Sequence, residues 1–92
     1  MAGWEVIIMI TARQSRAARA LLGWTQQELA DKALVSLTAL KRLESQKGLR
    51  VYETTDDQVR RAFEAAGIVL LRTDDGEGVL LTSQQVKKAK SS

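Results

Sequence analysis

The sequence contains no cysteine, no histidine and no proline. Without Cys and His it has no disulfides, thiolate nucleophiles or imidazole bases, and it lacks the commonest zinc ligands, so most enzyme mechanisms are excluded. The acidic pairs Asp56-Asp57 and Asp74-Asp75 are adjacent in sequence, which suits a helix start and a turn better than a paired acid and base. We therefore expect no catalytic residue, no metal and no cofactor.

Aromatic residues are scarce, at 4% against 45% hydrophobic residues overall. The core must then be built from Leu, Ala, Val and Ile, which suits small, closely packed helices, and 92 residues make one domain by size. The apolar run Val6 to Ile10 is far shorter than a membrane span and lacks the basic region that precedes the core of a signal peptide. We expect a cytoplasmic protein that does not enter a membrane.

Positive charge is in slight excess, with a net charge of +3, and it is unevenly placed. Residues 1–50 carry eight Lys or Arg against four Asp or Glu, whereas residues 51–92 carry six against seven. A basic surface suggests a polyanionic partner, although it is weak evidence without a motif beneath it. The motif has to be sought in the first half of the chain.

Two helix starts lie close together in that half. Residues 11–14 form a Thr-x-x-Gln capping box, whose side chains satisfy free N–H groups at a helix start, and Gly23 is a helix stop. Residues 25–28 form a second capping box almost at once. The sequence therefore predicts one helix to about Leu22 and a second helix, crossing the first, to about Ala33.

Residues 34–36 interrupt the helical pattern although no proline is present. Ser36 is a favourable N-cap, and it predicts a third helix from Leu37 to about Glu44. The interruption is then a three-residue turn between two short helices. This arrangement is a helix-turn-helix, which places its second helix in the major groove of DNA.

The apolar spacing changes in the second half of the chain. Residues 54–66 carry apolar side chains at helical spacing and predict a fourth helix, which Gly67 ends. Residues 68–71 and 79–81 are short apolar runs on either side of the turn-rich stretch 74–78, and they predict a β-hairpin. The expected fold is mainly α, with a bundle of about four helices and a C-terminal hairpin.

The chain divides into four parts without a linker between domains. These are an N-terminal extension at residues 1–9, a DNA-binding domain at 10–67, the hairpin at 68–82 and a basic tail at 83–92. The first eight residues are either an upstream extension or, through Val6 to Ile10, part of a strand beside the hairpin. The sequence leaves both alternatives open.

The helix-turn-helix resembles the Xre family, the lambda-repressor-like domains of phage and bacterial transcription regulators. The residues that carry the resemblance are Arg19, Gln26, Leu29, Ala30, Val35, Ser36, Leu40, Leu43 and Glu44. It extends from about Ile10 to Gly67, implies the lambda-repressor-like fold, and implies an ion pair between Arg19 and Glu44. Leu34 departs from the pattern, because most members have Gly there to allow a positive φ, which costs Leu on the order of 1 kcal/mol or more.

The resemblance also implies which residues contact DNA. The base-reading positions fall on Leu37, Thr38, Lys41 and Arg42. Lys and Arg can donate to guanine O6 and N7, while Thr and Leu can contact a thymine methyl. The phosphate contacts fall on Thr25, Gln26, Lys47 and Arg50, with Arg13 and Arg16 matching less closely. The simpler alternatives are a solvated helix face, a helix cap and, for Leu37, a core position.

We therefore expect a sequence-specific DNA-binding transcriptional regulator that binds double-stranded DNA and needs no cofactor. It is expected to act as a dimeric repressor or autoregulator. The hairpin strands have almost no polar alternation, so a second copy is expected to cover one face and to place the recognition helices about 34–36 Å apart. The operator is then an inverted repeat. The alternative is a protein-binding antitoxin or antiactivator that uses the hairpin to mask a protein partner.

Overall fold

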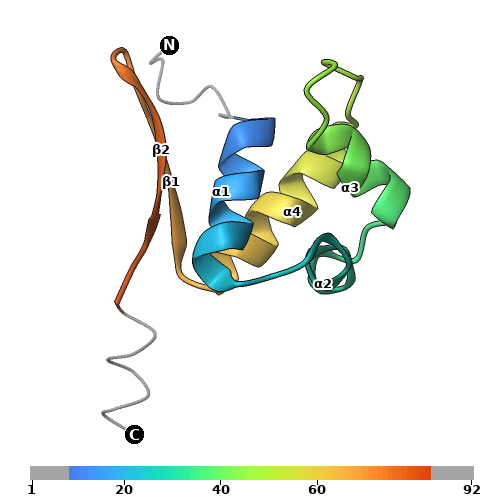
Figure 1. The fold of residues 1–92 in the computed structure, drawn as a ribbon, viewed down its shortest axis with the longest axis horizontal. Helices are drawn as coiled ribbons and strands as arrows, with labels where there is room; N and C mark the ends of the chain where they lie inside the picture. The colour runs from blue at the N-terminus through green and yellow to red at the C-terminus, as the bar shows by residue number, and fades with distance from the viewer. Residues whose placement is uncertain (1–8, 84–92) are drawn as a thin grey trace, which may run out of the picture.

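The computed structural model describes residues 9–83 as four helices followed by a two-stranded antiparallel hairpin (Figure 1). The elements are α1 (Ala12–Leu22), α2 (Gln26–Ala33), α3 (Leu37–Leu43), α4 (Glu53–Ala65), β1 (Ile68–Thr73) and β2 (Gly76–Leu81). The mainly helical fold with a C-terminal hairpin is therefore confirmed. Residues 1–8 of the expected extension and 84–92 of the expected tail lie outside the described residues. Of the alternative strand from Val6 to Ile10, only Met9 and Ile10 are described, and they belong to no strand.

Three of the helix starts are capped as the sequence predicts. The hydroxyl oxygen of Thr11 accepts the backbone N–H of Gln14 at 3.0 Å, and the Gln14 side chain accepts the N–H of Thr11. Thr25 and Glu28 form the same reciprocal pair on α2. Ser36 caps α3 through its side chain. Local side-chain chemistry thus sets these boundaries without proline.

The turn between α2 and α3 holds Leu34 in the left-handed conformation, with φ 59° and ψ 42°. The N–H of Val35 bonds to the carbonyl of Ala30 at 3.0 Å, which closes the end of α2 as glycine-containing caps do. The Leu34 side chain is 81% exposed, so burial contributes little to offset the backbone strain. The strain expected from the sequence is therefore present, and the turn retains its helix-turn-helix shape.

Replacing Leu34 with Gly should stabilise the domain by about 0.5–1 kcal/mol, because Gly removes the left-handed penalty and loses only part of that gain to unfolded-state entropy. The control is Leu34→Ala, which shortens the exposed side chain but keeps a Cβ at the same φ. Urea unfolding measures both variants. Equal stability of the two would show that the left-handed backbone at this position carries no penalty.

The core lies between the helices and is dominated by fully buried side chains of α2, α3 and α4. They include Leu29, Leu40, Val59 and Phe63. Trp24 stacks on Phe63 with ring centroids 6.0 Å apart, so two of the few aromatic residues pack together at the edge of this core. The helix α4 begins at Glu53, one residue before the predicted start, and its N-cap makes no side-chain hydrogen bond.

The hairpin turn is tighter than the sequence suggested. Only Asp74 and Asp75 separate the strands, because Gly76 pairs with Thr73 and Gly78 pairs with Leu71. The predicted turn at 74–78 was therefore too long. Glycines commonly mark turns, but here two of them belong to a strand.

The two faces of the hairpin differ in what covers them. Ile68 is buried, and Leu70 and Val79 pack against the helical core, with β2 running along α1 and β1 along α4. Directly paired residues share a face, so Val69 and Leu80 lie together on the opposite face, which is exposed. The helices therefore cover only one face of the hairpin, and a second copy on the other face stays a prediction.

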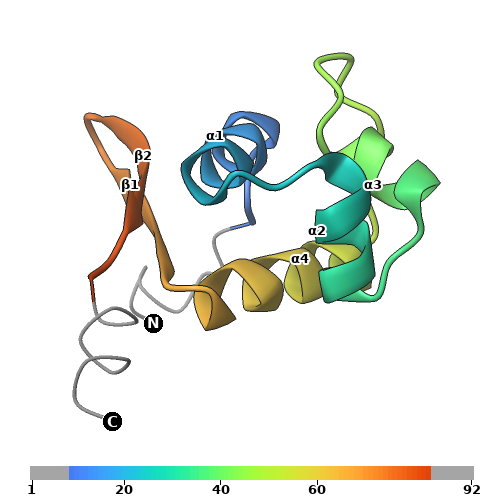
Figure 2. The same ribbon diagram turned by 60° about the horizontal axis from the view of Figure 1, so that its bottom comes forward.

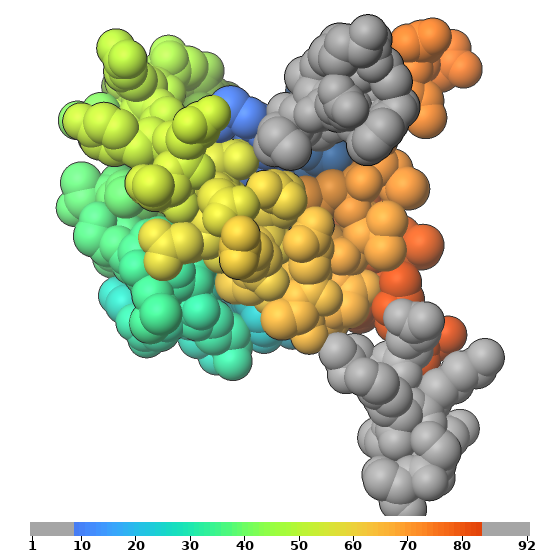
Figure 3. Space-filling model, turned by 180° about the vertical axis from the view of Figure 1, so that it is seen from behind, coloured from blue at the N-terminus to red at the C-terminus, as the bar shows by residue number. Residues whose placement is uncertain are grey.

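The hairpin and the helix-turn-helix lie at opposite ends of the domain. The longest of the principal extents, 42 Å, is horizontal in Figure 1, with the hairpin at one end and α3 at the other. The turned view in Figure 2 keeps the same separation. From behind, α4 crosses the middle of the surface between the two ends (Figure 3). Within residues 9–83, no helix is long and apolar enough to cross a membrane.

Candidate nucleic-acid interface

The helix α3 presents a buried apolar side and an exposed polar side. Leu40 and Leu43 are buried in the core. Thr38, Lys41 and Arg42 are exposed, and their spacing of three and four residues places them on neighbouring turns of one side. The structure thus brings these three predicted base-reading residues together on an open helix face.

Leu37 is placed differently from the other predicted base-reading residues. Its side chain is half-buried and packs against the core at the first turn of α3. The side chain therefore packs against the core, which was the simpler alternative to base contact for Leu37. A contact between its exposed part and a base stays a prediction.

The start of α2 offers backbone donors to an anion. Within residues 9–83 the N–H groups of Gln26 and Gln27 have no hydrogen-bond partner, as is usual in a first helical turn. The Thr25 hydroxyl caps the helix, and the Gln26 side-chain amide donates to Glu44 Oε1 at 3.0 Å. In the structure both side chains therefore serve the fold, and their predicted phosphate contacts are not tested by it.

The basic residues of the described chain fall into three groups: exposed residues without a partner, arginines paired with carboxylates, and two residues with other contacts. Lys41, Arg42, Lys47 and Arg50 are exposed and form no ion pair within residues 9–83. The arginines paired with carboxylates are Arg13, Arg19, Arg60, Arg61 and Arg72. Arg16 donates to the carbonyl oxygen of Glu44 at 2.6 Å, and Lys32 lies over the Trp24 ring. The unpaired cations are therefore concentrated on α3 and the loop that follows it.

Glu44 joins α1, α2 and the end of α3 through one buried carboxylate. Arg19 donates to both of its oxygens, at 2.8 Å and 3.0 Å, as the resemblance implied. Ser15 of α1 and Gln26 of α2 also donate to it. The ion pair between the first and third helices is confirmed, and the two additional donors were not foreseen from the sequence.

The environment of Glu44 favours its ionised form. Burial by itself raises the pKa of this carboxyl, but the hydrogen bonds from Arg19, Ser15 and Gln26 and the charge of Arg19 outweigh it, so the pKa lies below its ordinary value. Asp56 on α4 shows the opposite balance. Burial raises its pKa more than the N–H of Ile10 and the charge of Arg60 lower it.

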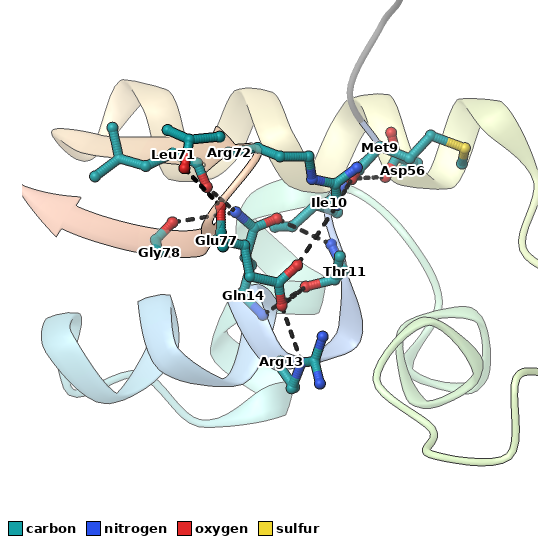
Figure 4. A network of polar contacts seen from close by, with 12 residues as sticks. Met9, Ile10, Thr11, Arg13, Gln14, Asp56, Leu71, Arg72, Glu77 and Gly78 are labelled. Carbon is teal, nitrogen blue, oxygen red and sulfur yellow. Dashed lines mark hydrogen bonds and ion pairs between the residues drawn. The ribbon is translucent and has the colours of Figure 1, made fainter.

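Gln14 fixes the hairpin against α1. Its side-chain nitrogen donates to the carbonyl oxygens of Leu71 at 3.0 Å and Gly78 at 3.1 Å, one on each strand (Figure 4). Its side-chain oxygen completes the capping box with Thr11. The sequence predicted only the capping role. The single available signal was the choice of Gln over Glu, which keeps two donors in the capping position.

Glu77 makes a second connection between the hairpin and α1. Its carboxylate accepts a hydrogen bond from the Thr11 hydroxyl at 3.0 Å and from Arg13 Nε at 2.9 Å (Figure 4). A guanidinium nitrogen of Arg72, the cross-strand neighbour of Glu77, lies 3.6 Å from the Oε1 atom of Glu77. Arg13, one of the less closely matching phosphate positions, is thus held at the hairpin.

Gln14→Glu should destabilise the domain by about 1–3 kcal/mol, because the new carboxylate still accepts in the capping box but leaves two strand carbonyls without their donor. Thermal melting followed by circular dichroism measures the loss. The control is Glu28→Gln at the matching capping position of α2, where the side chain is exposed and only accepts. Equal changes in the two variants would mean that the contact with the hairpin adds no stability.

Residues 16–49 match the helix-turn-helix family model. The matched segment runs from α1 through α2 and α3 into the following loop, so it includes the exposed face of α3 and the unpaired cations Lys41, Arg42 and Lys47, while Arg50 follows directly after it. This segment, 34 of the 92 residues, is therefore similar to helix-turn-helix proteins. The match confirms the resemblance to the Xre, lambda-repressor-like regulators. No curated protein matches the chain.

Proposed function

We propose that the protein is a sequence-specific DNA-binding regulator whose α3 enters the major groove. Thr38, Lys41 and Arg42 face the bases, where Lys and Arg can donate to guanine. The first turn of α2 and the cations Lys47 and Arg50 hold phosphates on either side. The protein is not an enzyme and takes no cofactor.

The observation that carries this proposal is the segregation of the cations. If these basic residues served only solubility, residues with and without an ion pair should be intermixed over the surface. Instead, the exposed residues without an ion pair, Lys41, Arg42, Lys47 and Arg50, lie together on α3 and the loop that follows it. Phosphate groups are the partners that such cations neutralise when a helix lies in a groove. Three of these residues, Lys41, Arg42 and Lys47, lie in the segment that matches the helix-turn-helix family, and Arg50 follows directly after it.

The regulatory role follows from the same resemblance. We infer a repressor or autoregulator that acts as a dimer on an inverted repeat in the bacterial cytoplasm, as small regulators of this kind do. The exposed face of the hairpin supports dimerisation, since Val69, Leu71 and Leu80 on this face are apolar and exposed. This face also supports the alternative of an antitoxin or antiactivator, which would place a different protein there.

A gel shift at physiological salt tests the DNA-binding function. The probe is the DNA upstream of the protein's own gene, and the competitor is random duplex in excess. A complex that survives the competitor supports the proposal. Equal competition by random and upstream DNA would favour the protein-binding alternative, which needs no preference among sequences.

A further inference from the structure

We propose that two copies pair through the outer face of the hairpin and thereby read half-sites about two turns of DNA apart. The outer face consists of Val69, Leu71, Gly78 and Leu80. The proposal rests on the DNA-binding function proposed above. It adds the spacing of the operator and the way in which two copies assemble on it.

The outer face has a shape that suits a second copy of itself. Val69 and Leu80 are directly paired and 38% and 51% exposed, and Leu71, at 45%, lies beside Gly78 on the neighbouring strand. A Cβ at Gly78 would be in ordinary contact with the Leu71 side chain, 3.9 Å away, so the glycine adds no side chain of its own and Leu71 borders it directly. A two-fold axis can lay this low apolar surface against the same surface of a second copy.

The size of the outer face argues for a partner that is already nearby. Three half-exposed aliphatic side chains offer an apolar patch of a few hundred Å² at most, whereas a stable interface takes roughly 800 Å² from each partner. Such a patch would bind a free protein only weakly. A second copy bound to the same DNA has an effective concentration near the millimolar range, which compensates for a weak contact. The occupant that fits is therefore a DNA-bound second copy.

The position of the outer face determines the spacing. The hairpin and α3 lie at opposite ends of the 42 Å axis, so pairing at the hairpins places the two α3 helices at the outer ends of the dimer (Figures 1 and 2). Two extents of 42 Å with packed sheets about 10 Å apart give the pair a total length of roughly 90 Å, and the centres of the two α3 helices lie inside its ends, roughly 60–70 Å apart. One turn of DNA is about 34–36 Å. Two turns therefore fit this arrangement, and the one-turn spacing expected by analogy does not.

Full-length protein binding to paired half-sites tests the proposal. A half-site selected from random DNA is placed in inverted repeats with centres about 10, 16 and 21 base pairs apart, and once alone. We expect at least tenfold tighter two-protomer binding at about 21 base pairs than at the others. Tightest binding at about 10, or equal binding at all spacings, would overturn the proposal. Binding to the single half-site reports separately on the DNA-binding function.

A neutral substitution on the outer face provides the second test. Leu71→Gln with Leu80→Gln should leave the affinity for one half-site unchanged and abolish the tenfold advantage of the paired sites. Leu21→Gln is the control, because Leu21 is 48% exposed on α1 rather than on the hairpin. Circular dichroism verifies that each variant is folded. Full cooperativity in the double variant would rule out the outer face as the contact.

Discussion

Glu44→Ala should reduce the free energy of unfolding by about 3–5 kcal/mol, which is a large part of what a small domain has. The side chain is 2% exposed and accepts hydrogen bonds from three residues on α1 and α2. Removing it leaves the Arg19 guanidinium without its carboxylate in a largely buried place. Urea unfolding should therefore show a much lower midpoint for the variant.

Glu64→Ala is the matched control for this result. Glu64 is a carboxylate on α4 whose side chain is 52% exposed and lies 3.7 Å from Arg60, so its loss should change stability by about 0.5 kcal/mol or less. A Glu44→Ala melt within a degree or two of the parent would show that the carboxylate does not hold the helices together.

The free energy of unfolding should depend on pH in the way expected for a carboxyl group whose pKa is lowered by folding, because of Glu44. Its pKa in the folded protein is below the ordinary value of 4.5, so its contribution is complete above that pH and disappears as the pH falls through the folded pKa. Asp56 works in the opposite direction, because its pKa is raised and its protonation favours the folded state. The difference between the parent and Glu44→Gln isolates the first effect, and it should shrink as the solution is acidified.

Arg42→Ala should weaken binding to the preferred sequence by about 1–3 kcal/mol, roughly 5- to 150-fold, and relax the preference at one base pair. The reason is that Arg42 is exposed and unpaired on the open face of α3. Arg50→Ala should instead weaken binding to all sequences alike and reduce the salt slope by about one. Fluorescence anisotropy on preferred and random duplexes at several salt concentrations measures both.

Arg61→Ala serves as the control for the arginine substitutions. Arg61 is exposed on α4 and paired with Asp57 at 2.8 Å, so its removal should leave DNA affinity and salt slope nearly unchanged. If Arg42→Ala weakened preferred and random DNA by the same factor, Arg42 would be a phosphate contact and not a base reader.

Features set by neighbouring residues could be predicted from the sequence. Thr11, Thr25 and Ser36 cap helices through hydrogen bonds to the N–H group three residues further on, so pattern alone identified them. The left-handed Leu34 was implied by the resemblance, since most members of that family have Gly at this position. The exposed side of α3 followed from helical spacing, since Leu40 and Leu43 could face only the core.

Features set by packing between distant residues could not be predicted. Gln14 reaches the hairpin across 57 and 64 positions of sequence, and no local pattern encodes that contact. The two faces of the hairpin could not be told apart, because both carry aliphatic residues. Leu70 is the example: it packs against the helices, while Leu71 beside it is exposed.

Selection of bound sequences from a random duplex pool tests most directly whether the exposed face of α3 reads bases. Parent protein and Arg42→Ala are taken through the same rounds at physiological salt, and the enriched pools are sequenced. We predict a defined motif for the parent and the loss of preference at one position of that motif, centred on a G·C pair, for the variant. Pools that stay random for the parent, or identical motifs from both proteins, would contradict the assignment.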